Sequence, residues 1–448
     1  MIPTAIRCVG VALLAIGLSL RPSAGAADSV ADTRSLGASM LRDLKSAVKS
    51  RYFDPQYRGV DLEAIFAKAE ARIKEATNEA QMSGILAQAV SEFGDSHTYY
   101  IPPIRPFDIT YGFETRMVGD LPLVVDVDED GDAERKGLLP GDRVLTIEGT
   151  PLTRANFAAV SYALNVALPR RQLALNVQTD TAPPRRIVVE ARVEERRKQI
   201  DITEWFDELI DRMRKHPRQA WRYWTYQKEK VVVARLYSFM VTDDLVNELM
   251  SKVHDARALI LDLRGNPGGS VEALQTAAGA FFEKEIDLGV QKERKGTKAL
   301  RSRRPKSKRL FTGDVIVLVD SASASSAEVL ARVMQIQKRG IVVGDQTAGA
   351  VMLAQHVSLS AGTRVRLVLY GVSVTIADLE MPDGGSLEGR GVIPDQIVLP
   401  TASDLREGRD PAMARAAKLA GLELSPAAAW SHFQAKPQAS PSPAAKQP

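Results

Sequence analysis

The hydrophobic residues between positions 36 and 93 recur at three- and four-residue spacing, which is the period of an amphipathic helix. Three stretches follow this pattern: LGASMLRDLKSAVKSRYF (36–53), DLEAIFAKAEARIKEA (61–76) and QMSGILAQAVSEF (81–93). The next segment, GDSHTYYIPP (94–103), ends the pattern because glycine and two prolines interrupt a helix. We therefore expect an N-terminal helical domain over residues 27–106.

The pattern changes after position 106 to short β-like runs with turn signals between them, which are typical of strands. These runs are LPLVVDVDE (121–129), DRVLTIEGTPL (142–152), LALNVQT (173–179) and RRIVVEARV (185–193). A single helical stretch, RANFAAVSYALNVA (154–167), lies among them. The sequence therefore predicts a small β-rich module with one helix over residues 107–195.

Strand-like and helix-like segments alternate in the third part of the chain, which predicts an α/β core with a partly parallel sheet over residues 196–400. The strand-like runs are VVVARL (231–236), RALILDL (257–263), VIVLV (315–319) and GIVVG (340–344), and VRLVLYGVSVTI (364–375) predicts hairpin strands. Within this part, the charged and tryptophan-containing residues 196–228 predict a connecting helix and linker. Residues 401–448 predict a helix followed by a disordered tail rich in proline and alanine.

The first residues have the organisation of a secretory signal peptide. Arg7 precedes the apolar stretch CVGVALLAIGLSL (8–20), and Ala24-Gly25-Ala26 supplies a small-x-small cleavage site. The alternative is a membrane anchor, but the apolar run is shorter than the roughly 20 residues that span a bilayer. We expect a signal peptide over residues 1–26, a periplasmic or secreted mature protein, and no stable membrane span after cleavage.

Composition removes several classes of function. The 448 residues allow two to four domains, and the net charge of +4 gives no indication of a nucleic-acid partner. Cys8 is the only cysteine, so the mature chain would have no disulfide, thiolate metal site or cysteine nucleophile. DVDEDG (126–131) resembles the start of a calcium loop, but Gly137 stands where the bidentate glutamate is needed. We expect no metal and no cofactor.

A basic run, QKERKGTKALRSRRPKSKRL (291–310), contains ten Lys or Arg residues and one Glu. Such runs are usually solvated, so we expect an exposed loop. A patch that binds anionic partners is the alternative.

Two turns follow apolar strands and precede helices: RGNPGG (264–269) and DSASASSAE (320–328). Ligands of α/β sheets bind at the carboxyl ends of the strands, so the two turns are expected to meet at one site. A serine there needs a base, and spacing alone does not select among His97, His216, His254, His356 and His432.

In this order, six segments resemble the S41-type serine peptidases, the C-terminal-processing and tricorn-core family. The segments are GDSHTYYI (94–101), GLLPGDRVLTIEG (137–149), LILDLRGNPGG (259–269), SASSAEVLA (323–331), VVGDQTAGA (342–350) and EGRGVIPD (388–395). The resemblance runs from about residue 35 to 400. It implies an α/β core of the ClpP/crotonase-like type with an N-terminal helical region and an inserted PDZ domain.

The PDZ resemblance lies in GLLPGDRVLTIEG (137–149) and implies a module that recruits peptides by strand addition. Its peptide-binding loop would include Tyr111, Gly112 and Phe113. The implied partner is therefore a peptide or protein substrate. The oligomeric state is left open by the sequence.

The resemblance also implies roles for individual residues. Ser325 would be the nucleophile, and Ser321, Ser323 and Ser326 would be structural. The oxyanion hole would use the amide of Ser326 and that of Gly268 or Gly269.

The base distinguishes two branches of the family. C-terminal-processing proteases have a lysine 25 positions after the serine, where this chain has Ala350. The tricorn-like branch uses a histidine from a D-x-H-T motif, which implies His97 as general base, with Ser96 and Glu388 holding its geometry.

The resulting hypothesis is an exported serine peptidase that cleaves peptides or unfolded proteins without a cofactor. The alternative is a catalytically inactive protein on the same fold that binds peptides or apolar ligands. The two differ in whether Ser325 and His97 come within hydrogen-bond reach.

Overall fold

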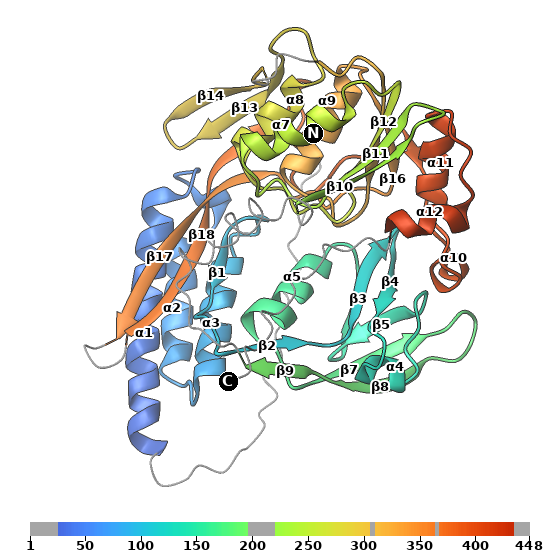
Figure 1. Cartoon of the computed structure of the whole chain (residues 1–448). Coiled ribbons are helices and arrows are strands. Elements are labelled where there is room, and N and C mark those ends of the chain that lie inside the picture. The colour runs from blue at the N-terminus through green and yellow to red at the C-terminus, as the bar shows by residue number, and fades with distance from the viewer. Residues whose placement is uncertain (1–25, 196–219, 305–309, 363–366, 434–448) are drawn as a thin grey trace, which may run out of the picture.

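The computed structural model describes residues 26–195, 220–304, 310–362 and 367–433. Figure 1 shows three regions: the N-terminal helices, an inserted β-rich region, and a larger α/β region that lies above both. Residues 1–25, where a signal peptide is expected, residues 196–219 of the expected connecting helix and linker, and the tail after residue 433 lie outside the described residues. No described helix combines the length and the apolar character needed to cross a membrane.

Three helices form the N-terminal region, as the periodicity predicts: α1 (Ala26–Arg51), α2 (Leu62–Ile73) and α3 (Glu79–Ser91). Side chains of Asp61 and Asn78 cap α2 and α3 by accepting backbone N–H groups. A short turn, η1 (Tyr57–Gly59), joins α1 to α2.

The apolar faces of these helices pack on a hairpin from the far end of the chain. Its strands are β17 (Met352–Gly362) and β18 (Leu367–Glu380), and its buried side chains Tyr370, Val372 and Val374 share a core with the helices. Strand β1 (Tyr99–Ile101) pairs with β18 on its other side. The segment that contains His97 is therefore fixed between α3 and β18.

The β-rich region enters and leaves through one strand pair, because β2 (Phe107–Thr110) is antiparallel to β9 (Arg192–Glu195). Its six-stranded sheet has the order β3-β4-β5-β7-β8, with β6 paired to β5. The strand bounds are β3 (Phe113–Val118), β4 (Leu121–Val127), β5 (Arg143–Ile147), β6 (Thr150–Pro151), β7 (Gln172–Gln178) and β8 (Arg185–Glu190). Helices α4 (Asp132–Arg135), α5 (Phe157–Tyr162) and the π-helical turn η2 (Ala163–Ala167) complete it.

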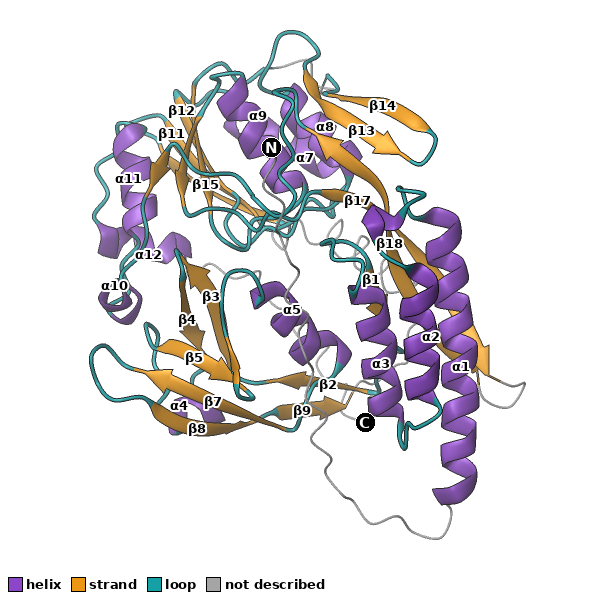
Figure 2. Cartoon of the chain, turned by 180° about the vertical axis from the view of Figure 1, so that it is seen from behind, coloured by secondary structure: helices purple, strands orange, loops and turns teal. Residues whose placement is uncertain are grey.

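The α/β region contains a second six-stranded sheet in the order β10-β11-β12-β15-β16-β19, parallel from β11 onward. Its strands are β10 (Trp221–Tyr226), β11 (Val231–Leu236), β12 (Ala258–Asp262), β15 (Asp314–Val319), β16 (Ile341–Gly344) and β19 (Gln396–Ile397). Helices α7 (Asp243–Val253), α8 (Val271–Gly279) and α9 (Ser326–Ile336) cover one face (Figure 2). The mixed α/β class predicted from the alternating pattern is confirmed.

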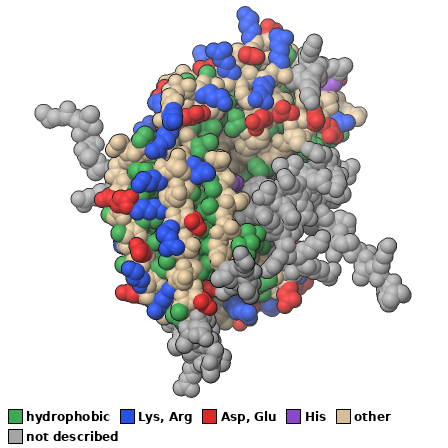
Figure 3. All heavy atoms as spheres, turned by 90° about the vertical axis from the view of Figure 1, so that its left-hand side faces the viewer, with side chains coloured by type: hydrophobic (Ala, Val, Ile, Leu, Met, Phe, Trp, Pro, Cys, Tyr) green, Lys and Arg blue, Asp and Glu red, His purple; other side chains and the backbone are tan. Residues whose placement is uncertain are grey.

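Two local predictions in this region are wrong. Residues 221–226 are an edge strand rather than a linker, because their alternating aromatic side chains pair along β11. The basic run is not a simple loop, since it begins in a hairpin of β13 (Asp287–Glu293) and β14 (Gly296–Arg301). Buried Leu300 and Gln291 anchor this hairpin, while Lys and Arg side chains gather at the top of the face in Figure 3.

The C-terminal segment folds into three helices instead of the single helix predicted: α10 (Ala402–Arg406), α11 (Pro411–Leu419) and α12 (Pro426–Phe433). Apolar side chains of α11 pack on the second face of the core sheet. A buried ion pair joins Asp410, the cap of α11, to Arg264 at 2.8 Å, and Arg264 also contacts Asp262 at 2.9 Å. The C-terminal helices are therefore tied to the turn RGNPGG (264–269).

We expect Asp410→Ala to lower the free energy of unfolding by about 3–5 kcal/mol, because it removes one carboxylate from a buried guanidinium. Asp383→Ala is the matched control, since its partner Arg332 is partly exposed and such pairs contribute about 0–1 kcal/mol. Urea unfolding followed by circular dichroism measures both. Equal losses in the two variants would contradict the prediction.

Candidate active site

Ser325 lies on the turn between β15 and α9 with a strained backbone. Its φ is 54°, a region that non-glycine residues rarely adopt and that costs about 1–3 kcal/mol. The residue caps α9, whose first amides have no intrahelical acceptor. The turn therefore presents the Ser325 hydroxyl to the positive end of a helix dipole, which favours a developing negative charge.

The other three serines of DSASASSAE (320–328) use their hydroxyls to build the turn. Ser321 donates to the carbonyl of Met117, Ser323 to that of Leu263, and Ser326 to that of Gly269. Among the described residues, Ser325 Oγ donates no hydrogen bond. Its hydroxyl is thus the one of the four that is left for chemistry.

A buried carboxylate, that of Glu328, holds the turn in place. It accepts hydrogen bonds from Ser325 N (3.0 Å), Ala350 N (2.9 Å), Gly349 N (2.8 Å) and Thr347 Oγ1 (2.5 Å). Burial raises the pKa of Glu328 to about 7, while these four donors act to lower it. Our sequence analysis gave Glu328 no role, although a glutamate three residues after a helix-capping serine is the spacing of a capping box.

The glycines of RGNPGG (264–269) allow a second turn to approach Ser325. A Cβ atom on Gly268 would lie 2.6 Å from Ser325 Cβ, and one on Gly269 would lie 2.2 Å from Met240 N. Both glycines have positive φ. The sequence prediction that the two turns meet is confirmed by this contact.

The amides expected to form an oxyanion hole are not equally available. The N–H of Gly268 donates to Asn266 Oδ1 at 2.9 Å. The amides of Ser326 and Gly269 make no hydrogen bond within the described part of the chain. An oxyanion hole built on Gly268 requires its bond to Asn266 to open, whereas Ser326 and Gly269 require no such change.

Glu388, Ser96 and His97 form a continuous hydrogen-bonded series. Ser96 Oγ donates to Glu388 Oε2 at 2.8 Å and lies 2.6 Å from His97 Nδ1. With the hydroxyl proton of Ser96 assigned to the carboxylate, the tautomer that completes the series has His97 Nδ1 protonated and donating to Ser96 Oγ. Nε2 of His97 then carries the lone pair, which is the state required of a general base.

The carboxylate of Glu388 also fastens the backbone on both sides of the site. It accepts the N–H of Ser96 and that of Val351, each at 2.8 Å. Burial raises the pKa of Glu388, and the donors oppose this effect. The adjacent carbonyl of Ala350 accepts the N–H of Ser325 at 2.9 Å. Residues 350–351 therefore connect the nucleophile segment to the histidine segment.

The described residues show no hydrogen bond between Ser325 Oγ and His97. Catalytic hydrogen bonds of a free enzyme are often long and tighten when substrate binds, so direct approach of Ser325 Oγ to His97 Nε2 stays a prediction.

The imidazole of His97 is kept neutral by its surroundings. Burial lowers the pKa of His97 to about 4, the charge of Asp95 opposes this, and His356 adds a smaller lowering effect. His356 is exposed on β17, and its Nε2 lies 3.4 Å from Tyr99 Oη. Of the alternative bases, His356 is the histidine nearest to Ser325 in the sequence.

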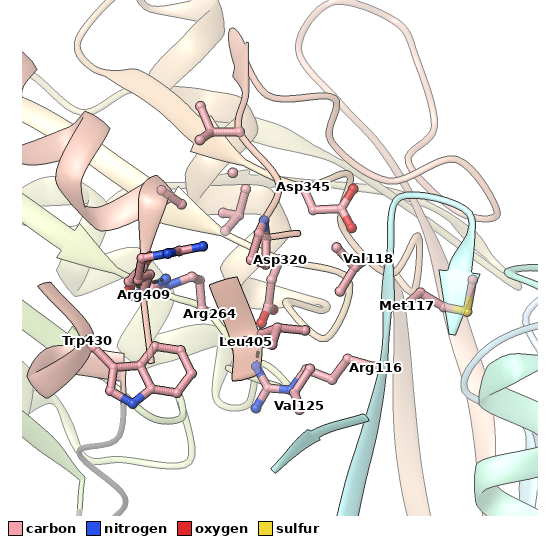
Figure 4. Close-up of a pocket in the computed structure, with 16 residues that line it drawn as sticks. Arg116, Met117, Val118, Val125, Arg264, Asp320, Asp345, Leu405, Arg409 and Trp430 are labelled. Carbon is pink, nitrogen blue, oxygen red and sulfur yellow. Dashed lines mark hydrogen bonds and ion pairs between the residues drawn. The ribbon is translucent and has the colours of Figure 1, made fainter. Parts of the chain in front are cut away.

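The inserted β-rich region contacts the nucleophile turn directly (Figure 4). Arg116 of β3 pairs with Asp320 Oδ2 at 2.6 Å. Asp320 Oδ1 accepts the N–H of Gly265 at 2.8 Å and that of Ala322 at 3.1 Å. One carboxylate therefore joins the two active-site turns to the inserted region. The cavity beside it is lined by apolar side chains that include Val125, Leu405 and Trp430.

A second cavity lies inside the inserted region, between β3 and α5. Its lining combines apolar side chains, among them Phe113, Phe157 and Leu164, with polar ones, among them Glu114 and Asn165. Tyr111 also lines the cavity, but its phenol is occupied, because it donates to Arg170 O and accepts from Arg170 N. Gly112 has a φ of 70° and accepts the N–H of Asp128. The three residues predicted for peptide binding thus lie at this cavity or at its edge.

The family model for peptidase family S41 matches residues 230–398. A carboxyl-terminal-processing protease of Synechocystis sp. is 31% identical over 143 residues, which are 32% of this chain and 31% of the relative. A tail-specific protease of Haemophilus influenzae is 30% identical over 192 residues, 41% of this chain and 27% of the relative. The chain thus spans about a third or less of the length of these curated relatives.

A solved structure supports the same fold. That of mature CPAF complexed with lactacystin covers 87% of this chain and 98% of its own, with a TM-score of 0.60 at 15% identity. Residues 230–398 thus match peptidase family S41, and the relatives with similar sequences are carboxyl-terminal-processing and tail-specific proteases, which are serine-type hydrolases.

The imidazole of His97 is expected to titrate with a midpoint at about pH 4 rather than near 6.5. Because the unfolded chain protonates this group first, stability is expected to fall as the pH drops from 6.5 to 4. NMR of the protein labelled at histidine Cε1 measures the midpoint, and His97→Gln assigns the signal. A midpoint at or above 6.5 would show that burial does not control this group.

Proposed function

We propose that this chain is an exported serine peptidase, with Ser325 as nucleophile and His97 as general base. The observation that carries the proposal is the Glu388–Ser96–His97 series, because it leaves the lone pair on His97 Nε2. It uses the histidine of the tricorn-like branch, and Ala350 offers no ammonium group in place of the lysine. The expected signal peptide supports export to the periplasm or the cell exterior.

The reaction follows from these positions. Ser325 Oγ attacks the carbonyl carbon of a peptide while its proton passes to His97 Nε2. The oxyanion that forms is stabilised by the amide of Ser326 and by that of Gly269, or of Gly268 after its bond to Asn266 opens. His97 then gives the proton to the leaving amine, and water releases the acyl group in a second cycle.

The positive charge that forms on His97 is stabilised through Ser96. In the resting state, the Nδ1 proton points to Ser96 Oγ and the Ser96 proton points to Glu388. Protonation of Nε2 makes the bond from Nδ1 to Ser96 charge-assisted, as the bond from Ser96 to the Glu388 carboxylate already is, and the two bonds polarise each other. Glu388 therefore acts on the imidazole indirectly, through the hydroxyl of Ser96.

The inserted region has the role of a PDZ domain in this proposal. Its cavity between β3 and α5 has the place and lining of a groove that adds a peptide strand and buries an apolar side chain. The ion pair of Arg116 and Asp320 ties that groove to the nucleophile turn. Substrates would be peptides or unfolded proteins with an apolar C-terminal residue.

A fluorophosphonate probe is expected to label Ser325 of the purified protein. Mass spectrometry locates the adduct, and His97→Ala is expected to slow labelling by about 10²-fold or more, the usual contribution of a general base. His356→Ala is the matched control and should label at the wild-type rate. A folded protein without an adduct would favour the alternative, a catalytically inactive binding protein.

A fluorescent peptide with an apolar C-terminal residue is expected to bind the inserted region. Leu164→Ser should weaken this binding about 10-fold, because a bound apolar residue would cover the half-buried Leu164 side chain, at about 25 cal/mol per Å² of apolar surface removed from water. Val166→Ser is the control, since Val166 is exposed and does not line the cavity. Anisotropy with the Ser325→Ala variant avoids cleavage. Equal affinities in the two variants would place the peptide elsewhere.

A further inference from the structure

A second carboxylate, that of Asp95, organises the loop that carries His97. Its Oδ1 accepts the N–H of His97 at 3.0 Å, the N–H of Thr98 at 2.7 Å and Thr375 Oγ1 at 2.6 Å. Its Oδ2 accepts Tyr52 Oη at 2.8 Å. Four donors thus converge on one side chain, and two of them belong to the backbone of the base and its neighbour.

These donors come from three separate parts of the fold. Tyr52 follows α1 and is fully buried, and Thr375 lies on β18 and is fully buried. Thr98 and Thr375 are joined a second time, because Thr375 N and Thr98 Oγ1 lie 3.1 Å apart. The His97 backbone is therefore fixed by Asp95 to two rigid elements, neither of which contains a residue of the proposed catalytic series.

Asp95 also acts on the imidazole by its charge. Its negative charge raises the pKa of His97 against the effect of burial, and it raises the pKa of Glu388 as well. The remaining groups that face the ring are Glu388, which acts through Ser96, and His356, which lowers the pKa of His97. Burial, with a contribution from Asp95, raises the pKa of Tyr52, so the phenol stays neutral as a donor.

We propose that Asp95 is a positioning residue for the reaction proposed above. It fixes the main chain of His97 through two amides, and its charge stabilises the imidazolium that forms when Nε2 takes the proton of Ser325. Glu388 acts on the Nδ1 side through Ser96, whereas Asp95 acts from the backbone side. The imidazolium thus has two carboxylates, of which only Glu388 belongs to the hydrogen-bonded series. This inference rests on the proposed function.

Two uncharged variants of Asp95 separate the effect of its charge from the effect of the hydrogen bonds that it accepts. Asp95→Asn keeps the carbonyl oxygen for the three donors at Oδ1, and its amide can donate to Tyr52 Oη. Asp95→Ser keeps an oxygen that accepts nearby backbone amides in an ST-turn, and it serves if Asp95→Asn does not fold. Tyr52→Phe is the matched control, because it removes one hydrogen bond and leaves the charge.

Peptide hydrolysis by the full chain measures the effect on the reaction. We expect Asp95→Asn to lower kcat about 10-fold or more with KM changed less than about 2-fold, because a general base contributes about 10²–10⁴ in rate. Tyr52→Phe should lower the unfolding midpoint and leave kcat within about 2-fold. A normal kcat in the folded Asp95 variants would overturn the proposal.

The histidine NMR titration tests the same inference without activity. The midpoint of His97, about 4 in the wild type, should move to lower pH in Asp95→Asn and stay in place in Tyr52→Phe. An unchanged midpoint in Asp95→Asn would overturn the electrostatic role. If the wild-type protein hydrolyses no peptide, the proposed function fails and the titration still decides whether Asp95 acts on His97.

Discussion

The carboxylate of Glu388 accepts hydrogen bonds from backbone segments that are far apart in the chain. Ser96 lies 292 residues away in sequence, yet both its N–H and its hydroxyl donate to this side chain. Val351 donates to the same carboxylate from the loop beside the nucleophile. Asp95 and β1 join the His97 loop to β18, but Glu388 joins it directly to the loop beside the nucleophile. The arrangement of the histidine relative to the serine therefore depends on this partly buried carboxylate.

Four carboxylates at the site, Glu388 among them, each join several segments by accepting their hydrogen bonds. Asp95, Asp320, Glu328 and Glu388 each accept three or more hydrogen bonds, and most of the donors lie in loops. A buried charge is costly unless donors compensate it, and backbone N–H groups of loops need acceptors for the same reason. Each carboxylate meets both needs at once. These hydrogen bonds hold strained turns such as that of Ser325 between their flanking strand and helix.

Acidic side chains also join the inserted region to the site. The inserted region is bounded by the strand pair β2–β9, which leaves it attached at one end. Its second attachment combines an apolar cluster of Leu123, Val125 and Leu405 with two ion pairs. Arg116 contacts Asp320, and Arg154 contacts Asp345 at 3.1 Å. Both acidic partners follow parallel strands of the core sheet, next to the turns that carry Ser325 and Thr347. A change in the orientation of the inserted region would therefore be transmitted to the active-site turns through these two ion pairs.

The sequence by itself determined the helices of the N-terminal region and four parallel strands of the core, β11, β12, β15 and β16, and its resemblance to a family supplied the four candidate catalytic residues. Periodicity records which face of an element is buried, and a motif such as SASSAE (323–328) is local, so both are visible without coordinates. It did not reveal that residues 221–226 are an edge strand, because their pairing depends on β11. It also did not reveal the roles of Glu328 and Asp95. Those roles consist of hydrogen bonds to donors such as Thr347, Gly349 and Thr375, and only the tertiary structure decides which distant backbone groups a carboxylate meets.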